Sequence, residues 1–281
     1  MKAKKLYKKL DRDFELSLCR DDWSRMDFNK FISPNFKSCY MGILLDNSNE
    51  IDMVYTAVFP SDNVLNQIIQ LEQPNILLFT HHPMVWDIRK PRVFEDINPK
   101  LLPILKEQNI SIYTLHVPLD KNGEYSTTSN LAKSIGVNPE GEFYEYFGVK
   151  VGIYGTIDSK TPEELAKRLS VKIGHKTKLW KYGSNEIKDQ RVALIAGGGN
   201  EIDIVQEIIN LGINTYITGI TILNEYSTKI HEFEKENGIN LIGGTHYSTE
   251  KFACIAVCRY FEKLGLNCEF MEDSPILEDM E

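Results

Sequence analysis

The sequence predicts an α/β fold, and two observations carry this prediction. Short apolar runs that suit strands alternate with segments of helical periodicity, first in the order strand, strand, helix, strand. Histidines directly follow two of these runs, at the strand ends where open α/β sheets bind their ligands. With 281 residues, the chain can form one large domain or two lobes.

Apolar spacing predicts the elements of the first part of the chain. Leucine and phenylalanine recur every four residues from Leu6 to Leu18, which is typical of an amphipathic helix. Ser61 or Asp62 can cap a later helix. The expected elements are a helix over 4–18, strands over 39–45 and 53–59, a helix over 62–71 and a strand over 75–80.

Two adjacent histidines, His81 and His82, follow the last of these strands, and Pro83 stops it. Successive strand side chains point to opposite faces, so the two imidazoles can serve two different centres. A pair of metal ions is one way to use both. The alternative is a pair of structural histidines that cap loop backbone.

A second strand, over 110–115, also ends in a histidine, His116, and Asp120 follows four residues later. If the two strands are parallel neighbours, these side chains and the pair at 81 and 82 lie at one edge of the sheet. Hard and borderline metals accept imidazole and carboxylate together. His116 can bind a metal directly or orient a ligand. Asp120 can instead belong to the turn at Lys121-Asn122-Gly123.

The second half of the chain repeats the alternation of strands and helices. We expect strands around 149–156, 191–196 and 214–218, and helices over 130–135, 162–169, 201–210 and 225–237. The glycines at 197–199 can present backbone amides to an anion at the start of a helix. A tight strand-to-helix turn is the favoured interpretation of these glycines.

A last strand delivers Gly243 and Gly244 and then His246, with Glu250 four residues later at the start of a helix. At this spacing the two side chains lie on one side of a helical turn, and one metal ion can bridge them. Glu250 has two oxygens and is the better candidate to bridge two ions. Cys254 and Cys258, farther along this helix, suit the core.

Composition excludes several classes of function. A net charge of −8 argues against a nucleic-acid partner and suits cation binding. The lysine-rich start lacks the apolar segment of a secretory signal, and no run reaches the roughly 18 apolar residues of a membrane span. The five scattered cysteines do not form a disulfide framework, so we expect a reduced, cytoplasmic compartment.

Three separated motifs together resemble one family. Thr80-His81-His82-Pro83, His116-x-x-x-Asp120 and Gly244-Thr-His246-x-x-x-Glu250 are similar, in order and coarse spacing, to the signature of the dinuclear-metal-centre hexameric proteins. These Nif-three-like proteins are often labelled GTP cyclohydrolase I type 2. The resemblance implies two divalent ions per chain, of zinc, iron or manganese. It implies that their ligands are His81, His82, Asp120, His246 and Glu250, with His116 close by.

The resemblance also implies the architecture. We expect two α/β lobes with mixed sheets flanked by helices, the metal-binding lobe from residues 1–140 plus 243–281 and the other from 141–242. The metal site would lie at strand carboxyl ends, and six chains would form a ring with the sites facing its interior. The chain departs from the family where Thr-Gly-Glu becomes Thr218-Gly219-Ile220, so its substrate contacts differ while the metal ligands are intact.

Hydrolysis is the leading functional hypothesis. Two metal ions activate water and clamp an oxyanion, which suits the cleavage of phosphate, amide or imine bonds, including the ring opening of a purine nucleotide. The expected catalytic residues are His116, as a general base or an orienting residue, and Glu250. The alternative is a non-enzymatic metal-binding or regulatory scaffold, or a metal-delivery protein.

Overall fold

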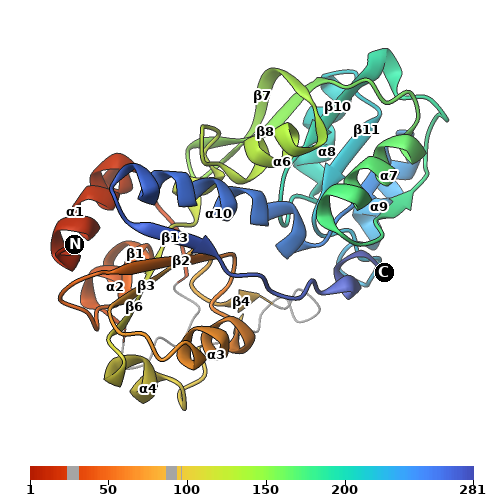
Figure 1. Cartoon of the computed structure of the whole chain (residues 1–281). Helices are drawn as coiled ribbons and strands as arrows, with labels where there is room; N and C mark the ends of the chain where they lie inside the picture. The colour runs from red at the N-terminus through yellow and green to blue at the C-terminus, as the bar shows by residue number, and fades with distance from the viewer. Residues whose placement is uncertain (24–31, 87–93, 96) are drawn as a thin grey trace. The chain divides into compact units, whose positions relative to one another are not determined.

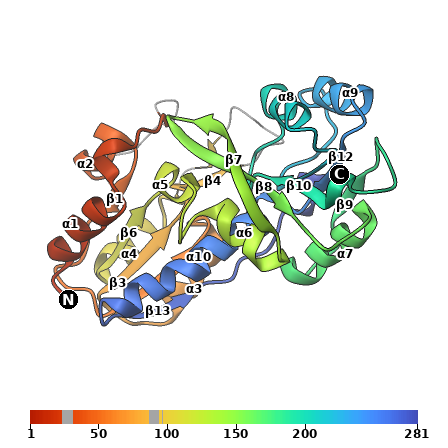
Figure 2. The same cartoon turned by 90° about the horizontal axis from the view of Figure 1, so that it is seen from above.

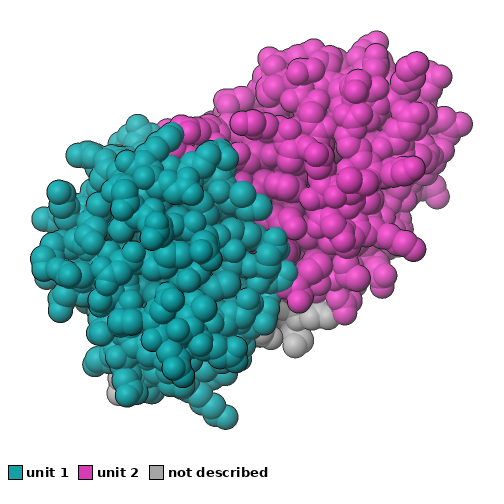
Figure 3. Space-filling model, viewed as in Figure 1, with its two compact units in different colours: residues 1–119, 254–273 teal, residues 120–253, 274–281 magenta. Residues whose placement is uncertain are grey.

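The computed structural model describes residues 1–23, 32–86, 94–95 and 97–281 (Figure 1). It confirms the predicted α/β class, with mixed sheets flanked by helices. The chain divides into two compact units, coloured separately in Figure 3. The first unit comprises residues 1–119 and 254–273, and the second comprises 120–253 and 274–281. The lobe bounds that the resemblance implies, at 140 and 243, stay a prediction.

The sheet of the first unit is mixed but mainly parallel. Its order is β1 (Gly42–Leu45), β6 (Ile110–Thr114), β3 (Ile76–Thr80), β2 (Met53–Ala57) and β13 (Asn267–Phe270). Only β1 is antiparallel to its neighbour. Every residue of β3 and β6 is buried, as expected for central parallel strands that are covered on both faces. A separate small sheet pairs β4 (Val85–Trp86) with β5 (Phe94–Glu95).

Helices cover both faces of this first sheet. On one face, α3 (Asp62–Gln70) and α4 (Leu102–Glu107) join Leu78 of β3 in one apolar cluster. The next residue, Phe79, points to the opposite face. There it contacts Phe261 of α10 (His246–Lys263), with 5.5 Å between ring centroids. Helix α1 (Ala3–Asp13) reaches the same layer through Tyr7, which stacks on Tyr113.

Several element bounds differ from the expectation, and two of these differences have a clear local cause. The first helix ends at Asp13 and not at residue 18, because Glu15 adopts a φ of 52° and a short 3-10 turn, η1 (Leu16–Leu18), follows. The expected strand over 39–45 is wrong in its first residues. Those residues end a helix, α2 (Pro34–Cys39), which forms because Ser33 caps it by accepting a hydrogen bond from the Phe36 amide (3.3 Å).

The sheet of the second unit is also mixed. Its order is β7 (Asn138–Tyr146), β8 (Val149–Thr156), β10 (Arg191–Leu194), β11 (Thr215–Thr218), β12 (Asn240–Gly243) and β9 (Lys178–Trp180). The central strands β10, β11 and β12 are parallel, and the outer pairs are antiparallel.

Four helices flank this second sheet, two on each face (Figure 2). Val192 and Leu194 of β10 face α6 (Thr127–Ile135) and α7 (Pro162–Ile173), whereas Ala193 faces α8 (Ile202–Asn210) and α9 (Thr228–Glu236). Short helical turns, α5 (Val117–Asp120), η2 (Lys188–Gln190) and η3 (Leu277–Met280), complete the elements. Across the described ranges, no helix is both long and apolar enough to cross a membrane.

Candidate metal centre

The histidine pair and His116 lie at one edge of the first sheet because β3 and β6 are parallel neighbours. Thr80 is opposite Thr114 in the register, and their hydroxyl oxygens are 2.8 Å apart. The backbone beyond β3 is held as well, since the amide of His81 donates to Ala57 O (3.2 Å) and that of His82 donates to Val58 O (2.9 Å). The pair therefore occupies a defined position at the carboxyl end of the strand.

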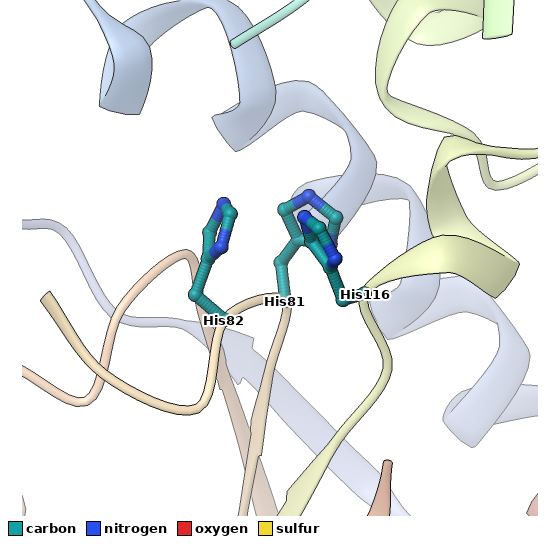
Figure 4. A group of neighbouring side chains, drawn as sticks. All are labelled: His81, His82 and His116. Atoms are coloured by element: carbon teal, nitrogen blue, oxygen red, sulfur yellow. The ribbon is translucent and has the colours of Figure 1, made fainter. Parts of the chain in front are cut away.

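Three buried imidazoles converge at this edge (Figure 4). His81, His82 and His116 are 0%, 1% and 6% exposed. Each offers one nitrogen, and these three atoms lie within 4.8 Å of one another. Two nitrogens that share one ion at bond lengths near 2 Å are separated by up to about 4 Å, so small side-chain rotations would bring all three to one cation. The group could hold a metal ion.

Hydrogen bonds orient two of these rings. His81 Nδ1 donates to the carbonyl oxygen of Leu115 (3.0 Å), and His116 Nδ1 donates to Asp21 Oδ2 (2.8 Å). Because both acceptors are oxygens without a proton, each Nδ1 carries the hydrogen and each Nε2 keeps its lone pair. Metal-binding histidines are oriented in this way, by an oxygen that accepts from the other ring nitrogen.

The third ring, His82, is held by aromatic neighbours. It stacks on Phe59 at 4.7 Å between centroids and meets the edge of Trp23 at 6.4 Å. Trp23 also donates from Nε1 to Asp21 Oδ2 (2.7 Å), so the indole ring and the acid that orients His116 support each other. The sequence interpretation assigned no chemistry to Asp21 or Trp23. The only local signal is an acid beside a tryptophan, and the partner of Asp21 is 95 residues away.

The second unit holds the other predicted donors. His246 and Glu250, on the first turns of α10, are 4% and 3% exposed, and Nε2 of the first lies 3.1 Å from Oε1 of the second. The His246 amide donates to Asp279 Oδ2 (2.9 Å), which anchors the start of the helix. Asp120 is half-buried and accepts a hydrogen bond from Thr127 Oγ1 (3.2 Å). These donor roles stay a prediction.

The glycines at 197–199 form a tight turn that packs against this pair. Gly197 has a φ of +75°, and a Cβ atom there would collide with Glu250 Oε1. Its amide donates to Thr249 Oγ1 (2.9 Å), and the Gly199 amide donates to Thr218 Oγ1 (3.1 Å). Both amides are used inside the protein, which agrees with the turn interpretation rather than with anion binding.

His175 contacts the same helix start. Its Nε2 lies 2.8 Å from the hydroxyl of Ser248, and Nδ1 donates to Lys176 O (2.8 Å). Ser248 is 1% exposed and lies between the two predicted ligands of α10 in the sequence. His175 therefore supports the position of the helix start.

Imidazole and carboxylate donors together suit borderline divalent ions such as zinc, iron and manganese. The first unit contributes three imidazoles, two with a fixed tautomer, and the second contributes one imidazole and two carboxylates. The donor set therefore fits the metals that the resemblance implies.

Comparisons with known proteins agree with the motifs. Residues 30–275 match the family model Duf34/NIF3 (NGG1p interacting factor 3). Two relatives are named GTP cyclohydrolase 1 type 2 homolog. The relative from Archaeoglobus fulgidus is 27% identical over 255 residues, covering 90% of this chain and 94% of its own. The relative from Borreliella burgdorferi is 28% identical over 262 residues, covering 92% of both chains.

A solved structure shows the same fold. It is titled "Structural genomics, protein ybgI, unknown function" and superimposes with a TM-score of 0.76 at 21% sequence identity, covering 98% of this chain and all of the other. The family model covers most of the chain, and the relatives match it nearly end to end. The chain therefore belongs to the Duf34/NIF3 family, as the three motifs predicted.

Proposed function

We propose that this protein is a metal-dependent hydrolase that holds two divalent ions per chain. The ligands are His81, His82, Asp120, His246 and Glu250. The observation that carries the proposal is the convergence of three buried imidazoles, two of which are oriented by oxygen acceptors. Orienting an imidazole costs conformational entropy, and a structural histidine needs no such convergence.

Divalent ions at this centre would supply Lewis acidity, which polarises the bond to be cleaved and lowers the pKa of a water molecule to about 7. His116 takes the proton of the attacking water. Its Nδ1–H donates to Asp21, so the carboxylate stabilises the imidazolium ion that forms. Glu250, which has two carboxylate oxygens, would help to hold the ions.

The first unit also offers a place for an anionic substrate. A hollow of about 860 Å³ is lined in part by Lys8, Arg12, Arg20 and Asp21. Because Asp21 also accepts the hydrogen bond from His116, a substrate in this hollow would lie one side chain away from the base. The relatives bear the name of an enzyme that acts on GTP, an anionic nucleotide. We therefore propose a nucleotide or phosphoester substrate.

Metal content and turnover test this function. Protein purified without chelator should contain about two transition-metal equivalents per chain, and zinc should load readily by affinity order. The loaded protein should hydrolyse GTP or a simple phosphoester, and Glu250→Gln should abolish this turnover. Glu234→Gln, a second buried acid in the same unit, is the matched control and should keep the rate. Absence of metal would remove the metal centre, and full activity of Glu250→Gln would place the turnover elsewhere.

Burial of the histidines favours one alternative, a metal-binding scaffold or metal-delivery protein. Closed, buried donor sets are typical of structural metal sites, and the three imidazoles are at most 6% exposed. Stoichiometric metal binding without turnover of any tested nucleotide or phosphoester would favour this alternative. For the assembly we propose a homo-hexamer, which light scattering would detect as six times the chain mass of 32.3 kDa.

A further inference from the structure

The first unit holds two cysteines that face each other away from the candidate metal centre. Cys258 lies on α10 and Cys268 on β13, the edge strand of the first sheet. In the register of β13 with β2, Cys268 is opposite Val54, and the side chain of Thr56 points to the same face as that of Val54. The Thr56 hydroxyl lies 3.3 Å from Cys258 Sγ. The helix thiol and the strand thiol therefore occupy the same interface.

The two thiols interact directly. The side chain of Cys268 lies close enough to that of Cys258 to lower the pKa of Cys258, and the pKa of Cys268 is raised in turn. The Thr56 hydroxyl lowers the pKa of Cys258 further. A thiolate is the form of cysteine that reacts with peroxides. Cys258 is thus the nucleophile of the pair, and Cys268 is positioned to resolve its oxidation product.

Two other thiols donate to backbone carbonyls at closer range than Cys258, whose Sγ donates to Cys254 O at 3.7 Å. Cys254 Sγ donates to Ala57 O (3.2 Å), and Cys39 Sγ donates to Met41 O (3.3 Å). A carbonyl acceptor stabilises the protonated thiol and not the thiolate. Cys268 is also half-buried on an edge strand, so a molecule as small as hydrogen peroxide can reach the pair.

We propose that Cys258 and Cys268 are a site of reversible oxidation, at which hydrogen peroxide converts the two thiols into one intramolecular disulfide. The Cys258 thiolate attacks one peroxide oxygen, the O–O bond breaks, and hydroxide leaves as water after protonation. Cys268 then attacks the sulfenic acid sulfur, the S–O bond breaks, and a second water leaves. The two sulfurs lose two electrons in total, and the peroxide gains them. The disulfide joins the end of α10 to β13, and this proposal does not depend on the proposed hydrolase function.

Peptide mapping of the full chain tests the proposal. The protein is treated with hydrogen peroxide, quenched with catalase, alkylated without reductant and digested. Of the five cysteines, two should become unreactive, and one cross-linked peptide pair should contain Cys258 and Cys268. Its mass should be about 2 Da below the sum of the reduced peptides, and dithiothreitol should reverse the change. The control Cys39→Ser should form the same cross-link.

A second variant distinguishes the roles of the two thiols. Cys268→Ser should form no cross-link and should leave Cys258 as a sulfenic acid that dimedone traps. The proposal is overturned if wild-type protein gives no 258–268 cross-link, if the link involves another cysteine, or if non-reducing gels show linked dimers instead. If Cys268→Ser does not fold, as circular dichroism would show, the wild-type map decides alone.

Discussion

Two buried pairs of a histidine and an acid, one in each unit, differ in a way that separates a candidate reactive site from core structure. In the first unit His116 Nδ1 lies 2.8 Å from Asp21 Oδ2, and in the second His231 Nδ1 lies 3.5 Å from Glu234 Oε2. Both histidines are at most 6% exposed. Residue types and burial are therefore alike, and the difference lies in what surrounds the acid.

The acid of the first pair accepts several hydrogen bonds. Besides His116, Trp23 donates to its Oδ2 and the Asp22 amide donates to its Oδ1 (2.8 Å). Glu234 has no hydrogen-bond partner for either oxygen among the described residues, and burial raises its pKa to about 8. Burial also lowers the pKa of His231, so both groups are neutral near pH 7. A histidine beside an acid therefore indicates chemistry only where hydrogen-bond donors surround the acid.

The largest expected effect comes from removing the imidazoles that only the first unit gathers. His81→Ala combined with His82→Ala should abolish stoichiometric metal binding, because it removes two proposed ligands. Elemental analysis and competition with a chelator would measure the loss, which we expect to exceed about 100-fold in affinity. His231→Ala is the matched control, since it removes a buried histidine from the second unit. Equal metal content in the wild type, the double variant and His231→Ala would show that His81 and His82 do not bind the metal.

The next largest effect is a pH dependence of the unfolding free energy that comes from the His231–Glu234 pair. The pKa of Glu234 is raised in the folded protein, from 4.5 to about 8. The folded state then holds a proton that the unfolded state releases, so stability is full below pH 4.5 and declines as pH rises towards 8. From pH 6.5 to 8 the wild type should lose on the order of 2 kcal/mol of unfolding free energy that Glu234→Gln keeps.

Urea unfolding at several pH values would measure this difference. His231 has a lowered pKa and contributes a dependence of opposite sign below about pH 6.5, which the subtraction of the Glu234→Gln curve largely removes. Tyr182, whose hydroxyl lies 3.0 Å from His231 Nδ1, stays protonated over this range because burial raises its pKa. Parallel curves for wild type and variant would show that Glu234 is charged at neutral pH.

The smallest effect sharpens the role of Asp21. Asp21→Asn keeps the shape of the side chain but removes the charge that orients and stabilises His116. Turnover should fall about 10- to 100-fold, because the proposed base His116 loses the charge that stabilises its protonated form. Metal affinity should stay the same, because His116 is not among the proposed ligands. Asp13→Asn, which changes an acid that pairs with Lys9 and Arg12 on α1, is the control and should keep the wild-type turnover. If Asp21→Asn keeps the wild-type turnover, His116 is not a base that depends on this acid.

Much of the site was predictable because it depends on local pattern. The strand over 75–80 and the strand over 110–115 were recognisable from their apolar runs, and each ends in a histidine. A parallel register then brings the two ends together without further information. The expected strand over 39–45 failed where a cap and a proline start a helix just before it, which short-range apolar pattern alone does not reveal.

The sequence by itself determined which side chains can act as donors, the elements that carry them and the family to which they belong. Only the tertiary structure decided which nitrogen of His81 and His116 is available, why Gly197 must lack a side chain, and that Cys258 meets Cys268. The physical reason is the range of the interactions. Helix and strand periodicity arises from neighbours along the chain, whereas these hydrogen bonds and close approaches depend on sheet register and packing between residues far apart in sequence.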